Sequence, residues 1–484
     1  MARVPYTRRL QRAALASAVV LTLAMSAPAA ADTDNQPIPP APTAPCDAYS
    51  PVAFPCVGTG KFADAVAWEC RRLPVSDRWC LLPLAHRVTQ SATDAYLQSW
   101  VHRTAQFQYA LQDSSSLHNA QWLGTHNSYN SLTEGFTLSH ADSNQQLSLT
   151  QQLNIDMRSI ELDLHYVPRL SQLGARAVVV CHGLSPAQGN LGCTNEPTFA
   201  HVLPEIATWL NAHPDQVIML YLEDALQDAA GYASAVATMD SVLQRPNHTS
   251  LIYHPNPADT GPDGCVTLPL NVSRDQVRLL GAQVIIVSKC APDWSADVFN
   301  WNPVEVESNK SSGYQPYPAC DPNFSRTVYD TKIVRYYEDT TFLSSLADPT
   351  MPPVNPNALT PSKVQSMTNC GVQMFGFDQI LPEDGRIQAS LWSWAPDEPR
   401  ANAGSCTLQR ADGHWVAAPC TDVHPAACLN GSTWSVTAPV TYAAAPAACT
   451  AAGSTFDLPL SGYQNAQLNA VATAGGGAWI KHPI

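Results

Sequence analysis

Short apolar segments alternate with helical segments through the middle of the chain. Apolar runs of this length are typical of strands, whereas apolar residues three and four apart are typical of helices. Strands that alternate with helices form parallel sheets with helical crossovers, and eight such strands suit a closed barrel. The predicted strands are Gln121–His126, Arg158–His165, Ala177–His182, Val217–Glu223, Gln283–Lys289, Lys332–Tyr337, Val372–Asp378 and Ile387–Trp394. The sequence therefore predicts an α/β fold of the TIM (β/α)8-barrel type.

The N-terminus has the layout of a secretory signal peptide. Four arginines precede the apolar run Ala13–Met25, and the small residues Ala29–Ala31 follow it. We expect cleavage near Ala31 and a secreted, extracellular protein, while Thr7–Leu10 is compatible with both the Sec and the twin-arginine route. No later stretch approaches the roughly 18 consecutive apolar residues of a membrane span, so no transmembrane segment is expected.

The cysteines and the net charge limit the partners of the chain. All 14 cysteines follow the predicted signal peptide, and an even number in an exported chain favours disulfides over metal thiolates. Cys181 and Cys193 are expected to pair and to hold the loop between them. The formal net charge of -14 argues against nucleic acid and against simple attraction to anionic membranes. A lipid partner would therefore have to be recognised by local chemistry.

A chain of 484 residues exceeds what one hydrophobic core usually serves, so we expect several segments. Residues 1–31 are the predicted signal peptide, and residues 32–45 form a Pro-rich linker. Residues 46–118 form a cysteine-containing cap and helix, and residues 119–395 form the barrel. Residues 396–484 form a small, disulfide-stapled, β-rich domain.

Reactive side chains lie at the ends of the first five predicted strands. They are His126 and Asn127, Glu161 and Asp163, His182, Glu223, and Lys289. Glu161 and Asp163 are two residues apart, so on a strand they share a face. Like charges about 4 Å apart repel by about 4 kcal/mol at an effective dielectric near 20. The three carboxylates therefore require a proton or a cation.

Calcium suits this group of carboxylates because it binds several oxygen ligands at once, and Asn127 adds an amide carbonyl. Magnesium is the less favoured alternative. Such a cation would offset the repulsion between the carboxylates and a phosphodiester. Two histidines that titrate near neutral pH could then serve as acid and base on opposite sides of a phosphorus. The residues thus favour metal-assisted phosphodiester chemistry.

Four segments, in order, resemble the signatures of the X region of phosphoinositide-specific phospholipases C. They are Gly124–Ser128, Arg158–Asp163, Cys181–Gly183 and Ile218–Glu223. The resemblance implies a TIM barrel and an attack of the inositol 2-hydroxyl on phosphorus, which releases diacylglycerol and a cyclic inositol phosphate. Metal-free bacterial relatives carry an arginine where this chain has Asp163, so the calcium-dependent branch is the closer match.

The same resemblance implies a role for each residue of the predicted site. Calcium would be bound by Asn127, Glu161, Asp163 and Glu223. His126 would stabilise the transition state, His182 would protonate the leaving alkoxide, and Glu161 would be a candidate base. Lys289 resembles a lysine that contacts substrate phosphate. In the second half of the barrel, Arg335, Tyr336 and Tyr337 are candidates for inositol contacts by position alone.

The C-terminal region resembles the two halves of a C-type-lectin-like domain placed in reversed order. This resemblance implies disulfides between Cys406 and Cys420 and between Cys428 and Cys449. A glycan is a possible partner of this domain. However, Arg400 and Val416–Ala417 stand where sugar-binding versions carry asparagine and acidic residues, which argues against calcium-dependent sugar binding.

Two other functions stay open. Glycerophosphodiester phosphodiesterases and sphingomyelinase-D-like enzymes also combine a first-strand histidine, a Glu-x-Asp pair and a later histidine, although the former usually follow the first histidine with Arg-Gly rather than Asn127–Ser128. A catalytically silent glycan- or lipid-binding protein is the non-enzymatic alternative. The complete set of histidines and carboxylates argues against it.

Overall fold

The structure is a computed structural model that describes most of the chain from residue 90 onward. The described residues are 90–131, 144–145, 147–169, 175–183, 186–190, 192–194, 196–307, 315–320, 325–339, 359–382 and 384–484. The predicted signal peptide, the linker and the four cysteines before residue 90 lie outside them. Within the described ranges, no helix is both long enough and apolar enough to span a membrane.

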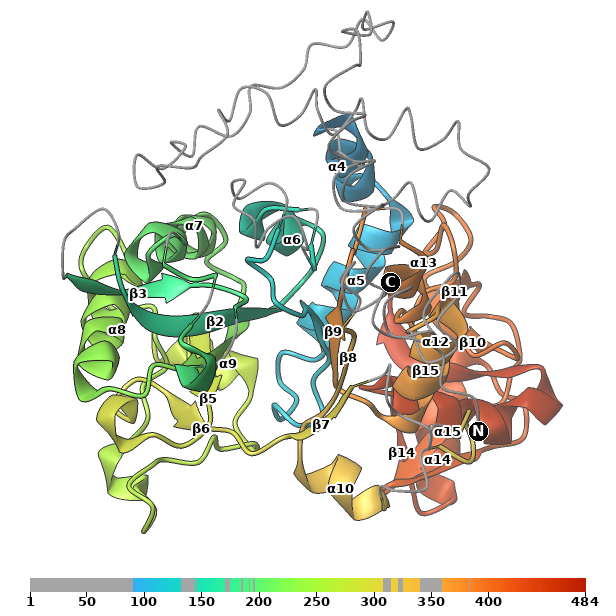
Figure 1. The fold of residues 1–484 in the computed structure, drawn as a ribbon. Helices are drawn as coiled ribbons and strands as arrows, with labels where there is room; N and C mark the ends of the chain where they lie inside the picture. Colours follow the sequence, from blue (N-terminus) through green and yellow to red (C-terminus); the bar gives the residue numbers. More distant parts are fainter. Residues whose placement is uncertain are drawn as a thin grey trace, which may run out of the picture.

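Eight parallel strands form the wall of a TIM-like barrel, as expected (Figure 1). Their spatial order is β6-β5-β4-β2-β1-β9-β8-β7. They are β1 (Trp122–Thr125), β2 (Ser159–Pro168), β4 (Ile218–Ala225), β5 (Val284–Ser288), β6 (Phe299–Asn300), β7 (Val304–Glu307), β8 (Val334–Tyr337) and β9 (Met374–Phe377). Among the described residues no ladder joins β6 to β7, so the hydrogen-bonded path of the sheet ends at these two strands.

Two of the eight predicted strands are not part of this wall. β3 (Arg176–Val180) pairs antiparallel with β2 and not parallel, because the short connection after Pro168 cannot hold a crossover helix. The segment predicted as a strand at Ile387–Trp394 instead begins in the helix α13 (Gly385–Ala389), where the Asp384 side chain accepts a hydrogen bond from the Arg386 backbone N–H. The short strands β6 and β7 take the two vacant positions.

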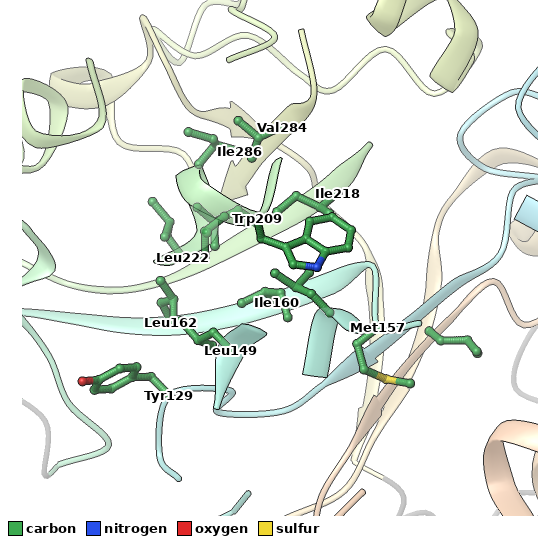
Figure 2. Close-up of a cluster of buried hydrophobic side chains, with 14 of the residues drawn as sticks. Tyr129, Leu149, Met157, Ile160, Leu162, Trp209, Ile218, Leu222, Val284 and Ile286 are labelled. Carbon is green, nitrogen blue, oxygen red and sulfur yellow. The ribbon is translucent and has the colours of Figure 1, made fainter. Parts of the chain in front are cut away.

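The barrel core is built from apolar strand residues and the helices that cover them. α7 (Phe199–Ala212) buries an apolar stripe with helical spacing against β2 and β4. Figure 2 shows Ile160, Leu162, Ile218 and Leu222 of these strands in one cluster with Trp209. Each fully buried side chain of this size contributes about 1.5–3 kcal/mol. α8 (Ala229–Val242) lies beside α7 on the outer side (Figure 1).

The remaining helices frame the sheet. They are α4 (Gln90–Leu97), α5 (Trp100–Leu111), α6 (Leu149–Asn154), α9 (Arg274–Leu279), α10 (Arg326–Thr331) and α12 (Pro361–Cys370). α4 and α5 are anchored by the buried Asp156 at the amino end of β2. Its carboxylate accepts hydrogen bonds from the Tyr96 hydroxyl at 2.7 Å and from the Gln106 amide at 2.5 Å. These contacts lie at the end of the strand opposite to the predicted site.

The C-terminal region forms two small antiparallel sheets with two helices. The elements are β10 (Cys406–Arg410), β11 (Trp415–Ala418), β15 (Gly477–Pro483), β12 (Ala427–Asn430), β13 (Thr433–Val436), β14 (Thr455–Phe456), α14 (Ala445–Ala451) and α15 (Gly462–Ala472). The two disulfides expected here, Cys406–Cys420 and Cys428–Cys449, are present, and so is Cys181–Cys193 in the barrel. The resemblance to C-type lectins stays a prediction.

The C-terminal region packs directly on the barrel (Figure 1). Phe107 of α5 lies with its ring 5.6 Å from that of Trp394 and 6.0 Å from that of Trp415. The Gln108 side-chain oxygen accepts hydrogen bonds from the backbone N–H groups of Trp392 and Ser393 at 2.8 and 3.0 Å. The segment after α13 thus packs between the barrel and the C-terminal region. This packing explains its apolar composition, although the segment is not a strand of the barrel.

Candidate active site

The predicted residues meet at the carboxyl ends of β1, β2 and β4. In β2, Ile160, Leu162 and Leu164 are fully buried in the core, whereas Glu161 and Asp163 line a small cavity on the other face. This confirms the expected alternation along the strand. Asp163 pairs in register with Glu223 of β4. The carboxylates of Glu161, Asp163 and Glu223 lie within 4.8 Å of one another.

The backbone conformation of residues 124–128, which include His126, depends on the identity of several of these residues. Gly124 lies so close to β2 that an added Cβ would approach the Ser159 carbonyl oxygen to 2.5 Å, so only glycine fits. Asn127 has a φ of 44°, in the left-handed region that asparagine tolerates. The Ser128 hydroxyl accepts a hydrogen bond from the Glu161 backbone N–H at 2.8 Å. The motif thus fixes His126 and Glu161 relative to each other.

His126 is held by a carboxylate from the last strand of the barrel. Its Nδ1 lies 3.2 Å from Oδ1 of Asp378, and its ring lies 5.0 Å from the ring of Tyr337. Burial alone would lower the pKa of His126, but the carboxylates of Asp378 and Glu161 outweigh burial and raise it to about 10. His126 is therefore an imidazolium at neutral pH. Because Asp378 engages Nδ1, Nε2 is the nitrogen that can donate to a ligand.

The pKa of His182 is displaced in the opposite direction to that of His126. It follows β3, beside the disulfide of Cys181, and its side chain is open to solvent on one side. The protein around it still removes enough water to lower its pKa, and the positive charge of His126 adds to this effect. The amide nitrogen of Asn130 lies 3.2 Å from its Nδ1. The pKa values of the two histidines are thus displaced in opposite directions.

Three asparagines connect the two histidines. The Asn144 amide donates to Oδ2 of Asp378 at 3.1 Å. Its oxygen accepts hydrogen bonds from the amides of Asn130 at 2.8 Å and Asn127 at 3.2 Å. The orientation of each histidine is therefore coupled to the residues beside the carboxylates.

Arg335 of β8 is a cationic partner of these carboxylates that the sequence reasoning did not assign. It is buried and pairs with Glu161, and it also donates to Oε1 of Glu305 at 2.6 Å. Burial raises the pKa of Glu161, and the charges of Arg335 and His126 offset this only in part. Burial, followed by Glu223 and Glu161, holds the pKa of Asp163 well above its ordinary value. Glu161 thus has a cationic partner in Arg335, whereas Asp163 and Glu223 mainly face each other and Glu161.

The donor set fits a hard divalent cation. The Asn127 side-chain oxygen lies 3.2 Å from both carboxylate oxygens of Asp163, a contact between acceptors that either a cation or a rotated amide would relieve. A cavity of about 10 Å³ lies among Asn127, Glu161, Asp163 and His182, which is about the room one water-sized particle needs. The carboxylates of this region outnumber its cationic groups. The carboxylates are Glu161, Asp163, Glu223, Glu305, Asp339 and Asp378, and the cations are Arg335 and His126.

The structure places Lys289 and Glu223 at the rim of the site. Both are exposed, and neither is among the described residues that line the small cavity. Tyr221 pairs with Val287, so extending this register by two residues brings Lys289 beside Glu223. Lys289 therefore lies at the same edge of the sheet as the carboxylates.

Two contributors were visible in the sequence only as strand ends. Asp378 ends the predicted strand Val372–Asp378, and Arg335 lies in Lys332–Tyr337, but nothing local assigns either to a partner. Their contacts join residues 252 and 174 positions apart. The site therefore depends on both halves of the barrel.

Comparison with known proteins gives matches over most of the chain. The family model of the Rv2075c PI-PLC-like domain matches residues 81–384. The uncharacterized protein Rv2075c of Mycobacterium tuberculosis strain ATCC 25618 / H37Rv is 63% identical over 483 residues, which cover 99% of this chain and 99% of that protein. The uncharacterized protein MT2135 of strain CDC 1551 / Oshkosh matches to the same extent.

Solved structures give weaker likenesses. The phosphatidylinositol-specific phospholipase C of Listeria monocytogenes is 15% identical, with a TM-score of 0.35 over 60% of this chain and 97% of that one. The S. aureus phosphatidylinositol-specific phospholipase C is 10% identical, with a TM-score of 0.36 over 61% and 98%. S. officinalis PLC21 is 15% identical, with a TM-score of 0.34. The match covers 55% of this chain and 34% of that protein. At these values, nothing about activity follows from the likeness.

Proposed function

Because the chain belongs to the Rv2075c PI-PLC-like domain family, we propose that it is a secreted, calcium-dependent phosphodiesterase that cleaves phosphatidylinositol-type phospholipids. The observation that carries this proposal is the placement of His126 and His182 beside the carboxylate cluster of Glu161, Asp163 and Glu223. A phosphoryl transfer needs one group that stabilises charge on phosphorus and groups that move protons. His126, His182 and Glu161 supply them.

The proposed reaction forms one O–P bond and breaks another. The inositol 2-hydroxyl attacks phosphorus and loses its proton to Glu161, whose carboxylate lines the small cavity. The imidazolium of His126, held by Asp378, donates to the phosphoryl oxygen on which negative charge develops. His182 protonates the diacylglycerol oxygen as its bond to phosphorus breaks. The products are diacylglycerol and a cyclic inositol phosphate, which a water molecule can open by the reverse proton transfers.

His182 must gain its proton before this last transfer. In the free protein its pKa is lowered. The negative charge of a bound phosphodiester favours the protonated form, so substrate binding and proton uptake at His182 are coupled. His182 thus acts as an acid only in the complex.

Asn127, Glu161, Asp163 and Glu223 are the residues that would hold the calcium ion. When bound, calcium supplies positive charge that offsets the carboxylates and makes a neighbouring hydroxyl more acidic. Magnesium suits the site less well because it requires a stricter octahedral geometry. Lys289 at the rim would contact a substrate phosphate.

The proposed contact with the membrane is peripheral. The net charge of -14 gives no general attraction to anionic lipid, so the headgroup itself must provide the recognition. Five disulfides among the described residues fit an extracellular protein. We therefore expect activity on the outer surface of membranes.

The test is release of water-soluble inositol phosphate from phosphatidylinositol vesicles, with calcium and with chelator. We expect release only with calcium, and a loss of at least about 100-fold in His126→Ala and in His182→Ala. His201→Ala is the matched control, because His201 is exposed on α7 away from the site. Full activity in either active-site variant would refute the mechanism.

The same assay separates the alternative enzymes. Phosphorus NMR on glycerophosphocholine and sphingomyelin would reveal glycerophosphodiesterase or sphingomyelinase-D-like activity. Cleavage of these substrates with phosphatidylinositol left intact would replace the proposed substrate. If every phosphodiester stays intact, the chain is a binding protein.

A cavity beside the C-terminal region favours glycan binding as a second function. It has a volume of about 300 Å³ and lies between α10, α12 and the β12–β13 and α15 elements. Aromatic rings and side-chain amides are frequent in its wall, a composition that suits the apolar faces and hydroxyls of sugars. They include Trp392, Trp434, Tyr463, Gln373 and Gln464. Trp434→Ala should abolish any oligosaccharide binding seen by calorimetry, and unchanged binding would exclude this cavity.

A further inference from the structure

A second cluster of metal-ligating side chains lies outside the barrel, separate from the active site. Asp240 belongs to α8, His254 follows the β-bridge at Ile252, and Asp297 precedes β6. One ligand atom from each of the three lies within 4.8 Å of the other two. Asp240 and His254 are exposed, whereas Asp297 is buried. The cluster is therefore reachable from solvent but has a buried floor.

The floor of this cluster carries an unsatisfied carboxylate oxygen. Oδ1 of Asp297 lies 2.9 Å from Nδ1 of His254, but Oδ2 is buried and has no hydrogen-bond partner in the protein. Among the described residues it is the one carboxylate oxygen in this condition. A buried acceptor without a partner is unfavourable, and charged acceptors are the most so. Something other than a protein atom is needed beside Asp297.

His254 is oriented as a metal ligand would be. The Ser250 hydroxyl lies 3.1 Å from its Nε2 and fixes the ring so that Nδ1 faces Asp297. Zinc binds imidazole nitrogen and carboxylate oxygen at about 2.0–2.2 Å, so two such ligands lie about 3.0–3.5 Å apart. The observed spacing of 2.9 Å requires only a small opening. One nitrogen and two carboxylates match a borderline ion such as zinc better than calcium, which takes oxygen ligands.

We propose that Asp240, His254 and Asp297 form a second divalent-cation site of the zinc type. The ion ties the last turns of α8 to the chain that enters β6. β6 is only two residues long, and it pairs with β5 and, through Asn300, with Thr267. A metal link beside this short strand would add to the few backbone hydrogen bonds that hold it.

The test is zinc titration of the full chain, freed of metal by a chelator, with calorimetry and elemental analysis. We expect one zinc ion at this site, with a Kd of about 10 µM or lower. Saturation should raise the melting temperature by roughly 2–5 °C. His254→Gln and the exposed Asp240→Asn should each weaken zinc binding at least about 10-fold. His248→Gln is the matched control, because this exposed histidine lies on the same loop but outside the cluster.

The outcome is independent of the active site. Asp163→Asn should keep this zinc binding, and His254→Gln should keep lipid cleavage within about twofold of the unaltered chain. Asp240→Asn lies on the surface, so loss of zinc binding in that variant cannot be ascribed to misfolding. If zinc binds equally well to the His254→Gln and Asp240→Asn variants, or does not bind the chelated chain, the three residues form only an ion pair and the proposal is wrong.

Discussion

Replacing Asp378 by asparagine tests the electrostatic reasoning about His126 directly. The variant keeps the size of the side chain but removes the carboxylate that faces Nδ1 at 3.2 Å. Burial then lowers the pKa of His126, and the remaining carboxylates near it, Glu161 foremost, are left to raise it. The pKa of His126 should therefore fall, which favours the neutral imidazole.

The magnitude follows from the displaced pKa. Each pKa unit corresponds to about 1.36 kcal/mol, so a shift from 6.5 to about 10 corresponds to about 5 kcal/mol. Because the folded pKa is raised, this stabilisation is fully present below pH 6.5 and is lost as the pH rises toward 10. Removing one partner of a buried pair costs about 3–5 kcal/mol while the pair is charged. The difference in free energy of unfolding between the unaltered protein and Asp378→Asn should therefore be large at pH 6.5 and decrease toward pH 10.

The assay is urea unfolding followed by circular dichroism at several values between pH 6 and 10, with disulfides intact. Asp228→Asn is the control, since this exposed carboxylate pairs with the exposed Arg176 at 3.3 Å and otherwise accepts a hydrogen bond from the Ala230 backbone N–H, which an asparagine oxygen can also accept. We expect the free energy of unfolding of this control to differ little from that of the unaltered protein, by an amount that does not depend on pH. Asp378→Asn should also lower kcat at least about 100-fold at pH 7. A stability gap for Asp378→Asn that stays constant between pH 6.5 and 10 would refute the assignment of an imidazolium to His126.

Three further changes probe other contacts. Asp163→Asn removes one proposed calcium ligand, so the calcium concentration for half-maximal lipid cleavage should rise about 10–100-fold in a calcium titration; an unchanged value would exclude Asp163 as a ligand. Arg335→Met leaves the buried Glu161 without its cationic partner, so the metal-free protein should lose about 3–5 kcal/mol and calcium should recover part of this in thermal melts. Asp156→Asn weakens the anchor of α4 and α5 and should lower the free energy of unfolding by about 1–3 kcal/mol without changing kcat/KM, as chemical denaturation and the lipid assay would show.

The sequence was most informative where local patterns are strong. The strands β1, β2, β4 and β5 coincide with predicted segments, because long apolar runs and period-two alternation are local signals. For the same reason the sequence alone predicts that Glu161 and Asp163 share one face of the strand. The placement of reactive residues at strand ends follows from the parallel topology alone.

The rest depends on contacts that no local pattern records. β6 and β7 are two and four residues long, too short to show a period. The direction of β3 is decided by the length of the loop before it and not by its own apolar residues. Ile387–Trp394 is apolar because it packs between the barrel and the C-terminal region. Buried strands have the same apolar composition, so the local sequence does not distinguish the two. Tertiary packing thus overrides the local signal at each of these positions.

The motif residues and the charged residues that interact with them lie in different halves of the barrel, so the motifs alone do not determine activity. The first half, β1 to β4, carries the motif residues, with Glu161 and His126 among them. The second half, β8 and β9, carries the charges that decide their protonation, since Arg335 faces Glu161 and Asp378 faces His126. A chain with the same first-half motifs but without Arg335 and Asp378 would keep the signature. Its buried carboxylates would then need a different counter-charge, and its first histidine would lose the carboxylate that most raises its pKa. Whether a chain of this family can carry out the proposed chemistry therefore has to be judged from the strand ends of the second half as well as from the motifs of the first.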